Sequence, residues 1–409
     1  MAIREPSLRA QALADLRDDF EELRFLCEAR RECSPRLARW SEELAAERRP
    51  LAGVRDRYAD LIRREYAYIA ALAAGNEWQS PSFAHSLRSQ AGRQEGRILA
   101  HVDDYKRDRH ADAAAYEAAY LRELVGVPGV SALATSCGMA ALTTILWFLA
   151  FELRLDGPIL LGRGSYHETK ELVTKAFAGR VVEVEEAELR RAMAEVAPSA
   201  LFVDSLCNSR GLAVPDLDAM LAAAGCWTVV DNTCLGPGCR PFSSRAPRLL
   251  VWESLLKLAQ FGLDRANAGI LLARGPETER LSALREHLGT NAPDTAILSL
   301  PPPSRARLER RLARLERNAA LLAERLGGFY PGVGPLVGLD VAEPGPWIAR
   351  ALEQARRRGV QVAAGTSFGF DHTRVYVTAP GLDSFLRIAP GTEDRLRIET
   401  VAEALSAAA

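Results

Sequence analysis

Two residues with complementary chemistry stand at the ends of two short apolar segments in the middle of the chain. The segment WTVV (227–230) runs into Asp231, and 26 residues later a second apolar segment has passed through Ser254 to reach Lys257. Ligands of open α/β sheets bind at the carboxyl ends of the strands. If both segments are strands of one sheet, a carboxylate and an amine face the same crevice.

A carboxylate and an amine in one crevice are what pyridoxal phosphate (PLP) requires. A lysine forms a Schiff base with this cofactor, and an aspartate keeps the pyridine nitrogen protonated so that the ring can accept electrons from the substrate. The hydroxyl of Ser254, three residues before Lys257, can bind the phosphate. The alternative is that Asp231 caps a loop and Lys257 only begins a helix, and the spacing alone does not decide between the two.

The sequence around these residues resembles the cystathionine γ-synthase and methionine γ-lyase family of PLP-dependent enzymes. In that family a V-V-D-N-T segment precedes an S-x-T-K segment that carries the PLP lysine. Here the two segments are VVDNT (229–233) and SLLK (254–257), and the following FGLDRANAGIL parallels the family's Gly-His-Ser-Asp…Gly-Gly run. The resemblance implies that Lys257 carries PLP and that Asp231 holds the ring nitrogen.

A glycine-containing turn supplies a further motif. TSCGMAA (135–141) resembles the family's S-G-M-A-A turn. The resemblance implies that the turn at Cys137, Gly138 and Met139 binds the cofactor phosphate, because unpaired backbone N–H groups and the helix dipole favour an anion at a helix N-terminus. Taken alone, such a turn often does no more than start a helix.

Two motifs imply contacts with the cofactor ring. SYHET (165–169) resembles the family's Y-G-x-T, so Tyr166 would stack on the pyridine ring and help with proton transfer. DSLCNS (204–209) resembles E-S-P-x-N-P, which places Asn208 near the phenolic oxygen of the cofactor. In isolation, a tyrosine after a strand is more often part of the core, and an asparagine in a turn is commonplace.

The motif DYKR (104–107) resembles the family's Y-S-R. The resemblance implies that Tyr105 and Arg107 reach across a dimer interface to the phosphate in the neighbouring subunit, a task that suits the planar fork of arginine. It therefore implies a homodimer with shared active sites, and a tetramer is usual in the family. By itself the motif is typical of a solvated basic turn.

A last motif concerns the substrate. FLRIAPGTED (385–394) resembles the family's R-[LI]-S-V-G-x-E-D, so Arg387 would bind the α-carboxylate of an amino acid, with help from Ser367. The resemblance covers the chain from about Trp78 to the C-terminus. Each motif is weak alone, but their common order across the chain favours the family.

Several positions depart from the family pattern. Leu256 replaces the phosphate-binding threonine before the lysine, and Leu206 and Ser209 replace two prolines. Glu168 occupies a position where the family has a small residue or cysteine. An acid there could act as a base or receive a cationic group of the substrate, or it could point into solvent or cap the next helix. These changes suggest an unusual amino-acid substrate and a role in specialised metabolism.

The resemblance implies γ- or β-elimination or replacement on a substituted L-amino acid, through a substrate–cofactor Schiff base and a carbanion. Lys257 would remove the α-proton, and Tyr166 with Glu168 would assist the departing group. A halogenated or acylated four-carbon amino acid fits this chemistry. An aminotransferase, decarboxylase or aldolase on the same fold stays possible, and so does a catalytically inactive binding module.

The elements that position these residues follow an α/β pattern. From about residue 111, short apolar segments alternate with helical ones, which predicts a mostly parallel sheet with helices on both faces. We expect a helical N-terminal extension and connector that contacts the partner subunit (1–110), a large PLP-binding domain of fold type I (111–300), and a linking helix with a small α+β C-terminal domain (301–409). Strands are expected at 131–134, 159–161, 181–184, 200–203, 227–230, 249–252, 336–339, 375–377 and 385–388, and helices at 112–124, 135–151, 189–196, 217–224 and 305–326.

Composition excludes some classes of function. The 409 residues contain 52 basic and 53 acidic side chains, a net charge of −1 that does not suggest a nucleic-acid or membrane partner. The seven cysteines have no C-x-x-C spacing, so we expect neither a metal site nor a disulfide framework. The charged N-terminus has no secretory signal pattern, and a cytoplasmic protein with a small-molecule substrate is expected.

Overall fold

The computed structural model describes residues 7–76, 111–244, 246–378 and 384–408. The chain divides into two compact units. The larger unit comprises Ala70–Ala259 and Arg265–Arg305, and the smaller comprises Met1–Ile69, Gln260–Asp264 and Ala306–Ala409. The N-terminal helices therefore cluster with the C-terminal part of the chain.

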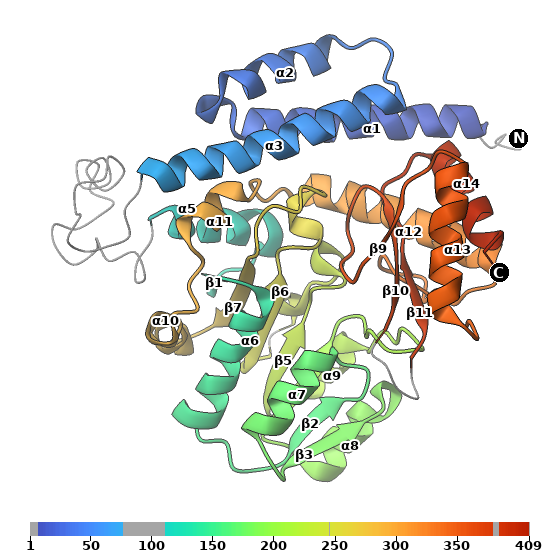
Figure 1. Ribbon diagram of the computed structural model, residues 1–409. Helices are drawn as coiled ribbons and strands as arrows, with labels where there is room; N and C mark the ends of the chain where they lie inside the picture. Colours follow the sequence, from blue (N-terminus) through green and yellow to red (C-terminus); the bar gives the residue numbers. More distant parts are fainter. Residues whose placement is uncertain (1–6, 77–110, 245, 379–383, 409) are drawn as a thin grey trace, which may run out of the picture. The chain divides into compact units, whose positions relative to one another are not determined.

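A seven-stranded sheet forms the centre of the larger unit (Figure 1), with strand order β1-β7-β6-β5-β4-β2-β3. β7 alone runs in the opposite direction to the other six strands of this sheet. The sequence therefore predicted the fold class correctly. The strands are β1 Val130–Thr135, β2 Ile159–Gly162, β3 Val181–Val184, β4 Ala200–Asp204, β5 Trp227–Asp231, β6 Leu249–Ser254 and β7 Gly269–Arg274.

Helices cover both faces of this sheet, because its strands β2, β4 and β5 are buried along their whole length. Such burial is usual for parallel strands that lie between two helical layers. One hydrophobic cluster packs α6, α7 and α10 on one face, and a second packs α5, α8, α9 and α11 on the other. These helices are α5 Ala111–Tyr120, α6 Gly138–Trp147, α7 His167–Ala176, α8 Leu189–Val196, α9 Leu217–Ala223, α10 Glu277–Leu288 and α11 Asp294–Ser299.

The smaller unit combines a second sheet with long helices. Its four strands are ordered β8-β11-β10-β9. Among the described residues, the sequence patterns had not indicated α13, α14 or β9. The elements are α1 Leu8–Ala29, α2 Pro35–Ala46, α3 Ala52–Asn76, α12 Arg305–Leu326, β8 Val337–Leu339, α13 Pro344–Arg357, β9 Val362–Ala364, β10 Thr373–Val377, β11 Leu386–Ala389 and α14 Arg395–Ser406.

The N-terminal helices begin at recognisable caps. Ser7 accepts a hydrogen bond from the Ala10 amide, and Ser34 accepts bonds from the amides of Arg36 and Leu37 just before Pro35 starts α2. Among the helices that the structure describes, none combines the length and the apolar character needed to cross a membrane.

Candidate active site

Six of the seven strands in the larger unit run in one direction and end at the same edge of the sheet. These strands are β1 to β6, and Asp204 at the end of β4 is in register with Asp231 at the end of β5. The residues that the sequence had singled out for the cofactor, among those that the structure describes, lie at these strand ends or in the segments that follow them. They are Cys137, Gly138, Met139, Tyr166, Asn208, Asp231, Ser254 and Lys257.

Asp231 and Lys257 interact electrostatically. Burial raises the pKa of Asp231 to about 6, while hydrogen bonds from Thr233 and the positive charge of Lys257 lower it. The Thr233 amide donates to Asp231 Oδ1 at 2.9 Å. Lys257 is half-buried, three residues beyond the end of β6. The predicted pair of amine and carboxylate therefore belongs to one local site.

A second buried carboxylate, Asp204, was not identified from the sequence. Burial and the neighbouring Asp231 raise its pKa well above the usual range of an aspartate. Its Oδ2 accepts a hydrogen bond from the Tyr166 amide at 3.0 Å, which fixes the start of the loop that carries the tyrosine. In the sequence, the one feature that could have indicated Asp204 is its position as the first residue of DSLCNS, directly after an apolar run.

Glycine is required at the start of α6. A Cβ atom added to Gly138 would lie 2.9 Å from Ser254 Cβ and 3.1 Å from the Trp252 ring. Cys137 is the N-cap, and its Sγ accepts a hydrogen bond from the Ala140 amide at 3.3 Å. The first amides of an α-helix have no acceptor within the helix, so those of Gly138 and Met139 are available to an anion beside Ser254.

Further polar groups support this edge. The Ser254 amide donates to Thr233 Oγ1 at 3.0 Å, which ties the end of β6 to the loop after β5. Asn232 Nδ2 donates to Glu253 at 2.6 Å, and burial raises the pKa of Glu253 to about 7. Within the described ranges, the buried Ser205 Oγ has no hydrogen-bond partner.

These groups fit PLP. The edge provides an amine for covalent attachment, a carboxylate for the ring nitrogen, and a helix start where only glycine fits, which suits a phosphate. The orphaned Ser205 hydroxyl leaves a donor for a further polar group of a ligand. No group of three His, Cys, Asp or Glu residues that could hold a metal ion occurs in the part of the chain that the structure describes.

The side chains of Tyr166 and Glu168 form a hydrogen bond with each other. The Tyr166 hydroxyl donates to Glu168 Oε1 at 2.9 Å. Tyr166 is half-buried, whereas Glu168 is exposed in the first turn of α7, where the helix dipole favours a negative charge. The acid at this unusual position therefore has the tyrosine hydroxyl as its partner, which the sequence did not indicate.

The predicted substrate-binding residues belong to the smaller unit. Arg387 lies in β11 with only 4% of its surface exposed, and its guanidinium donates to the Thr366 carbonyl. The guanidinium also lies over the Tyr376 ring, 5.4 Å from the ring centroid. Ser367, which follows Thr366, has a shielded Oγ without a hydrogen-bond partner among the described residues. The buried Arg387 guanidinium is thus bonded to the residue directly before Ser367, whose hydroxyl has no partner among the described residues.

Three predicted residues and the cysteines complete the comparison with the sequence. Asn208 is partly exposed in the loop after β4. Tyr105 and Arg107 lie outside the described residues. The seven cysteines are all described, and they form no disulfide.

Comparison with known proteins places this geometry among related folds. No protein-family model matches the chain. The bifunctional enzyme flvA of Aspergillus flavus is 25% identical over 66% of this chain, and the match spans only 38% of that enzyme's own length.

Solved structures match more of the chain. Cystathionine γ-synthase from Xanthomonas oryzae, in complex with aminoacrylate and cysteine, has a TM-score of 0.62 at 21% identity, covering 76% of this chain and 89% of that one. Cystathionine γ-lyase (CalE6) from Micromonospora echinospora has a TM-score of 0.60 at 23% identity, with coverages of 76% and 89%. The chain therefore has the fold of the cystathionine γ-synthases and γ-lyases.

Proposed function

We propose that the chain is a PLP-dependent enzyme that catalyses elimination or replacement at the β- or γ-carbon of a substituted L-amino acid. The observation that carries this proposal is the interaction of Asp231 with Lys257 at the sheet edge where Gly138 starts α6. The similarity to cystathionine γ-synthase and γ-lyase structures supports the same class of reaction.

The residues of the larger unit would hold the cofactor and move protons. When bound, PLP supplies an electron sink for the substrate. Asp231 would keep the proton on the pyridine nitrogen, and the amides of Gly138 and Met139 would bind the phosphate with Ser254. The amine of Lys257 would remove the proton from the α-carbon and then pass it on, so that a substituent on the β- or γ-carbon can leave.

Other side chains would bind the substrate. Arg387 would pair with the α-carboxylate, for which its planar fork is suited, and the Ser367 hydroxyl would donate to the same group. The hydroxyl of Tyr166 would move a proton at the departing group. Glu168 would orient that hydroxyl through the hydrogen bond of 2.9 Å between them.

The departures from the family pattern bear on the substrate. Glu168, Ser209 and Leu256 change the polarity beside the proposed cofactor residues, which favours an unusual amino acid and a role in specialised metabolism. A halogenated or acylated four-carbon amino acid would present the required leaving group. We also propose a homodimer in which Tyr105 and Arg107 complete the site of the partner.

The absorption spectrum of the purified chain with PLP tests the proposal. The unaltered protein should show a visible band, because PLP bound covalently to a lysine absorbs there, and Lys257→Ala should lack it. Lys175→Ala is the matched control, since Lys175 is an exposed lysine of α7 with 73% of its side chain accessible. Addition of γ-substituted amino acids should change the band and release a leaving group.

Two results would contradict the proposal. No visible band in the unaltered protein at saturating PLP would remove the cofactor chemistry and favour a binding module. Conversion of the cofactor to its amine form, with a 2-oxo acid as product and no leaving group, would identify an aminotransferase instead.

A further inference from the structure

The segment that follows the proposed PLP lysine has an unusual backbone. Phe261, Gly262 and Asp264 have φ values of 50°, 78° and 51°. Of the five described non-glycine residues with positive φ, two therefore fall within this short stretch. A bulky residue such as phenylalanine is a genuine outlier in this region, and it persists only where surrounding contacts hold it.

Arg63 of α3 holds the backbone of this segment. Its Nη2 donates to the Gly262 carbonyl at 2.8 Å, and its Nε donates to the Leu263 carbonyl at 3.1 Å. The guanidinium thus spans two successive carbonyls with a rigid fork, so it restrains their orientation as well as their position.

Side chains hold the same segment at both ends. Phe261 is 2% exposed, and its ring meets that of Phe25 of α1 edge-on, with centroids 5.5 Å apart. At the other end, Asp264 forms an ion pair with Arg374 of β10 at 3.6 Å. All of these partners belong to the smaller unit, as does the segment itself.

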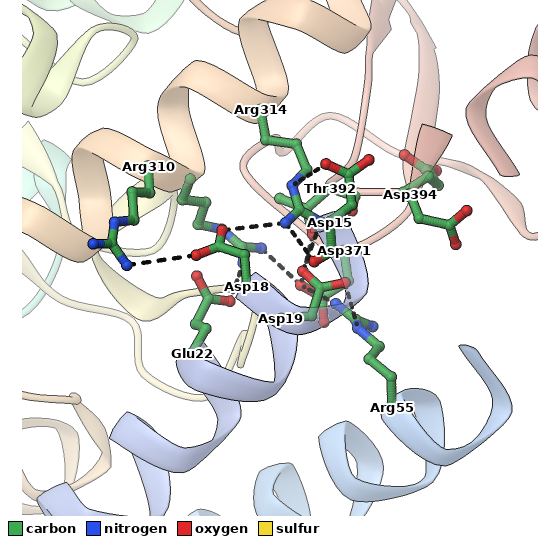
Figure 2. A network of polar contacts seen from close by, with 12 residues as sticks. Asp15, Asp18, Asp19, Glu22, Arg55, Arg310, Arg314, Asp371, Thr392 and Asp394 are labelled. Atoms are coloured by element: carbon green, nitrogen blue, oxygen red, sulfur yellow. Dashed lines mark hydrogen bonds and ion pairs between the residues drawn. The ribbon is translucent and has the colours of Figure 1, made fainter. Parts of the chain in front are cut away.

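A buried ion network fixes the N-terminal helices that supply these contacts (Figure 2). Arg55 of α3 pairs with Asp19 of α1 at 3.6 Å and with Asp371 at 3.1 Å. Asp371 also accepts a hydrogen bond from Arg311 of α12 at 2.8 Å. A Cβ atom on Gly262 would lie 2.5 Å from Asp371 Oδ1, so the segment rests directly on this network.

We propose that the N-terminal helical layer, comprising α1, α2 and α3 to Ile69, positions Lys257, and that Arg63 is the principal positioning residue. A single 3-10 turn, Leu258–Gln260, joins the lysine to the held segment. Through so short a link, the orientation of Gly262 and Leu263 limits the conformations that the lysine backbone can adopt. The role assigned to Lys257 rests on the proposed function.

The competing explanation is that Arg63 only attaches the helical layer and has no effect on the lysine. Arg63→Met removes the donors and keeps the apolar stem of the side chain. Arg64→Met is the matched control on the same helix, since Arg64 is 74% exposed and pairs only with its helix neighbour Asp60 among the described residues. Arg63→Lys keeps the positive charge but replaces the planar fork with a single ammonium group.

Two measurements separate the explanations. Hydrogen exchange of the cofactor-free protein reports the segment directly, and Arg63→Met should raise exchange at residues 258–265 about tenfold. With PLP bound, the apparent pKa at which the visible band titrates should shift in Arg63→Met, because that value depends on how the lysine is held. Arg63→Lys should restore part of the shift, and Arg64→Met should leave both measurements unchanged.

The inference is overturned if Arg63→Met matches Arg64→Met in the titration of the band. If exchange rises throughout α1 and α3, the layer has detached, and Phe25→Leu decides the question because it removes the ring contact with Phe261 and keeps Arg63. A shifted titration in Phe25→Leu with normal exchange in α3 supports the inference, and an unshifted one overturns it. A missing band in the unaltered protein would instead overturn the proposed function.

Discussion

Gly138 is a position where one added carbon changes both packing and the proposed phosphate site. Gly138→Ala places a Cβ atom 2.9 Å from that of Ser254, so we expect overpacking to lower the free energy of unfolding by about 1–3 kcal/mol. The start of α6 must then move, and PLP affinity should fall about tenfold, as expected for the loss of about 1.4 kcal/mol of binding free energy. Urea unfolding of the cofactor-free protein and a PLP titration measure the two effects.

The matched control for this substitution is Gly225→Ala. A Cβ atom at Gly225 would have no neighbour within 4 Å, so stability should be unchanged or higher by about 0.4–1 kcal/mol. Equal PLP affinity of the two variants would show that the start of α6 does not bind the phosphate.

Glu393 should make stability depend on pH. Burial raises its pKa to about 7, and within the described residues its Oε2 is shielded without a hydrogen-bond partner, as suits a carboxyl that keeps its proton. Between the unfolded value of 4.5 and about 7, the folded state binds more protons than the unfolded state. The free energy of unfolding should therefore decrease as pH rises through this window.

Glu393→Gln isolates this effect. The amide cannot ionise, so the contribution of this position to the loss of stability between pH 5 and pH 8 should disappear. Thermal unfolding midpoints of both proteins at the two pH values measure it. An equal change in midpoint for both proteins would mean that Glu393 ionises in the folded state as it does in the unfolded state.

At the scale of elements, buried arginines of α12 form ion pairs with carboxylates of α1. Figure 2 shows Arg314 of α12 directed toward Asp15, Asp18 and Asp19 of α1. Arg314 Nη1 donates to Asp19 at 2.8 Å, and its Nη2 donates to Asp18 at 3.1 Å. Removing one partner of such a buried set leaves the others desolvated and uncompensated.

Arg314→Met should therefore destabilise the smaller unit by about 3–5 kcal/mol. Arg310→Met is the control on the same helix, because Arg310 is 61% exposed and lies 3.7 Å from Asp18. An exposed pair of this kind contributes about 0–1 kcal/mol. Chemical unfolding measures both changes, and equal losses would mean that the network adds little to the attachment of α1.

Elements differ in how well their sequences predicted them. The pattern of α12 was visible because leucines and arginines alternate with a helical period over Arg305–Leu326. Strand β7 was not predicted, although all but its last residue are buried. An apolar run does not reveal the direction of a strand. β7 is defined by its pairing with both β6, the strand before it, and β1, which lies far away in the sequence.

At the scale of the whole molecule, the proposed dimer with shared active sites makes a prediction. Arg107→Ala and Lys257→Ala should each be inactive, because one lacks the contact to the partner's phosphate and the other lacks the amine. Refolding the two variants together should restore about a quarter of the activity of the unaltered protein, since random pairing gives half of the dimers one intact site of two. No recovery in dimers shown to be mixed would mean that each subunit completes its own site.

The sequence by itself predicted the α/β fold class, which the structure confirms, and it predicted a carboxylate and an amine at one edge of the sheet. Asp231 and Lys257 follow buried runs, and the short apolar segments around them predict an α/β sheet, because these signals are local along the chain. Contacts between distant segments were decided only by the tertiary structure. The bond from Tyr166 to Glu168, the buried Asp204 beside Asp231, and the hold of Arg63 on a carbonyl 200 residues away depend on packing that no local period encodes.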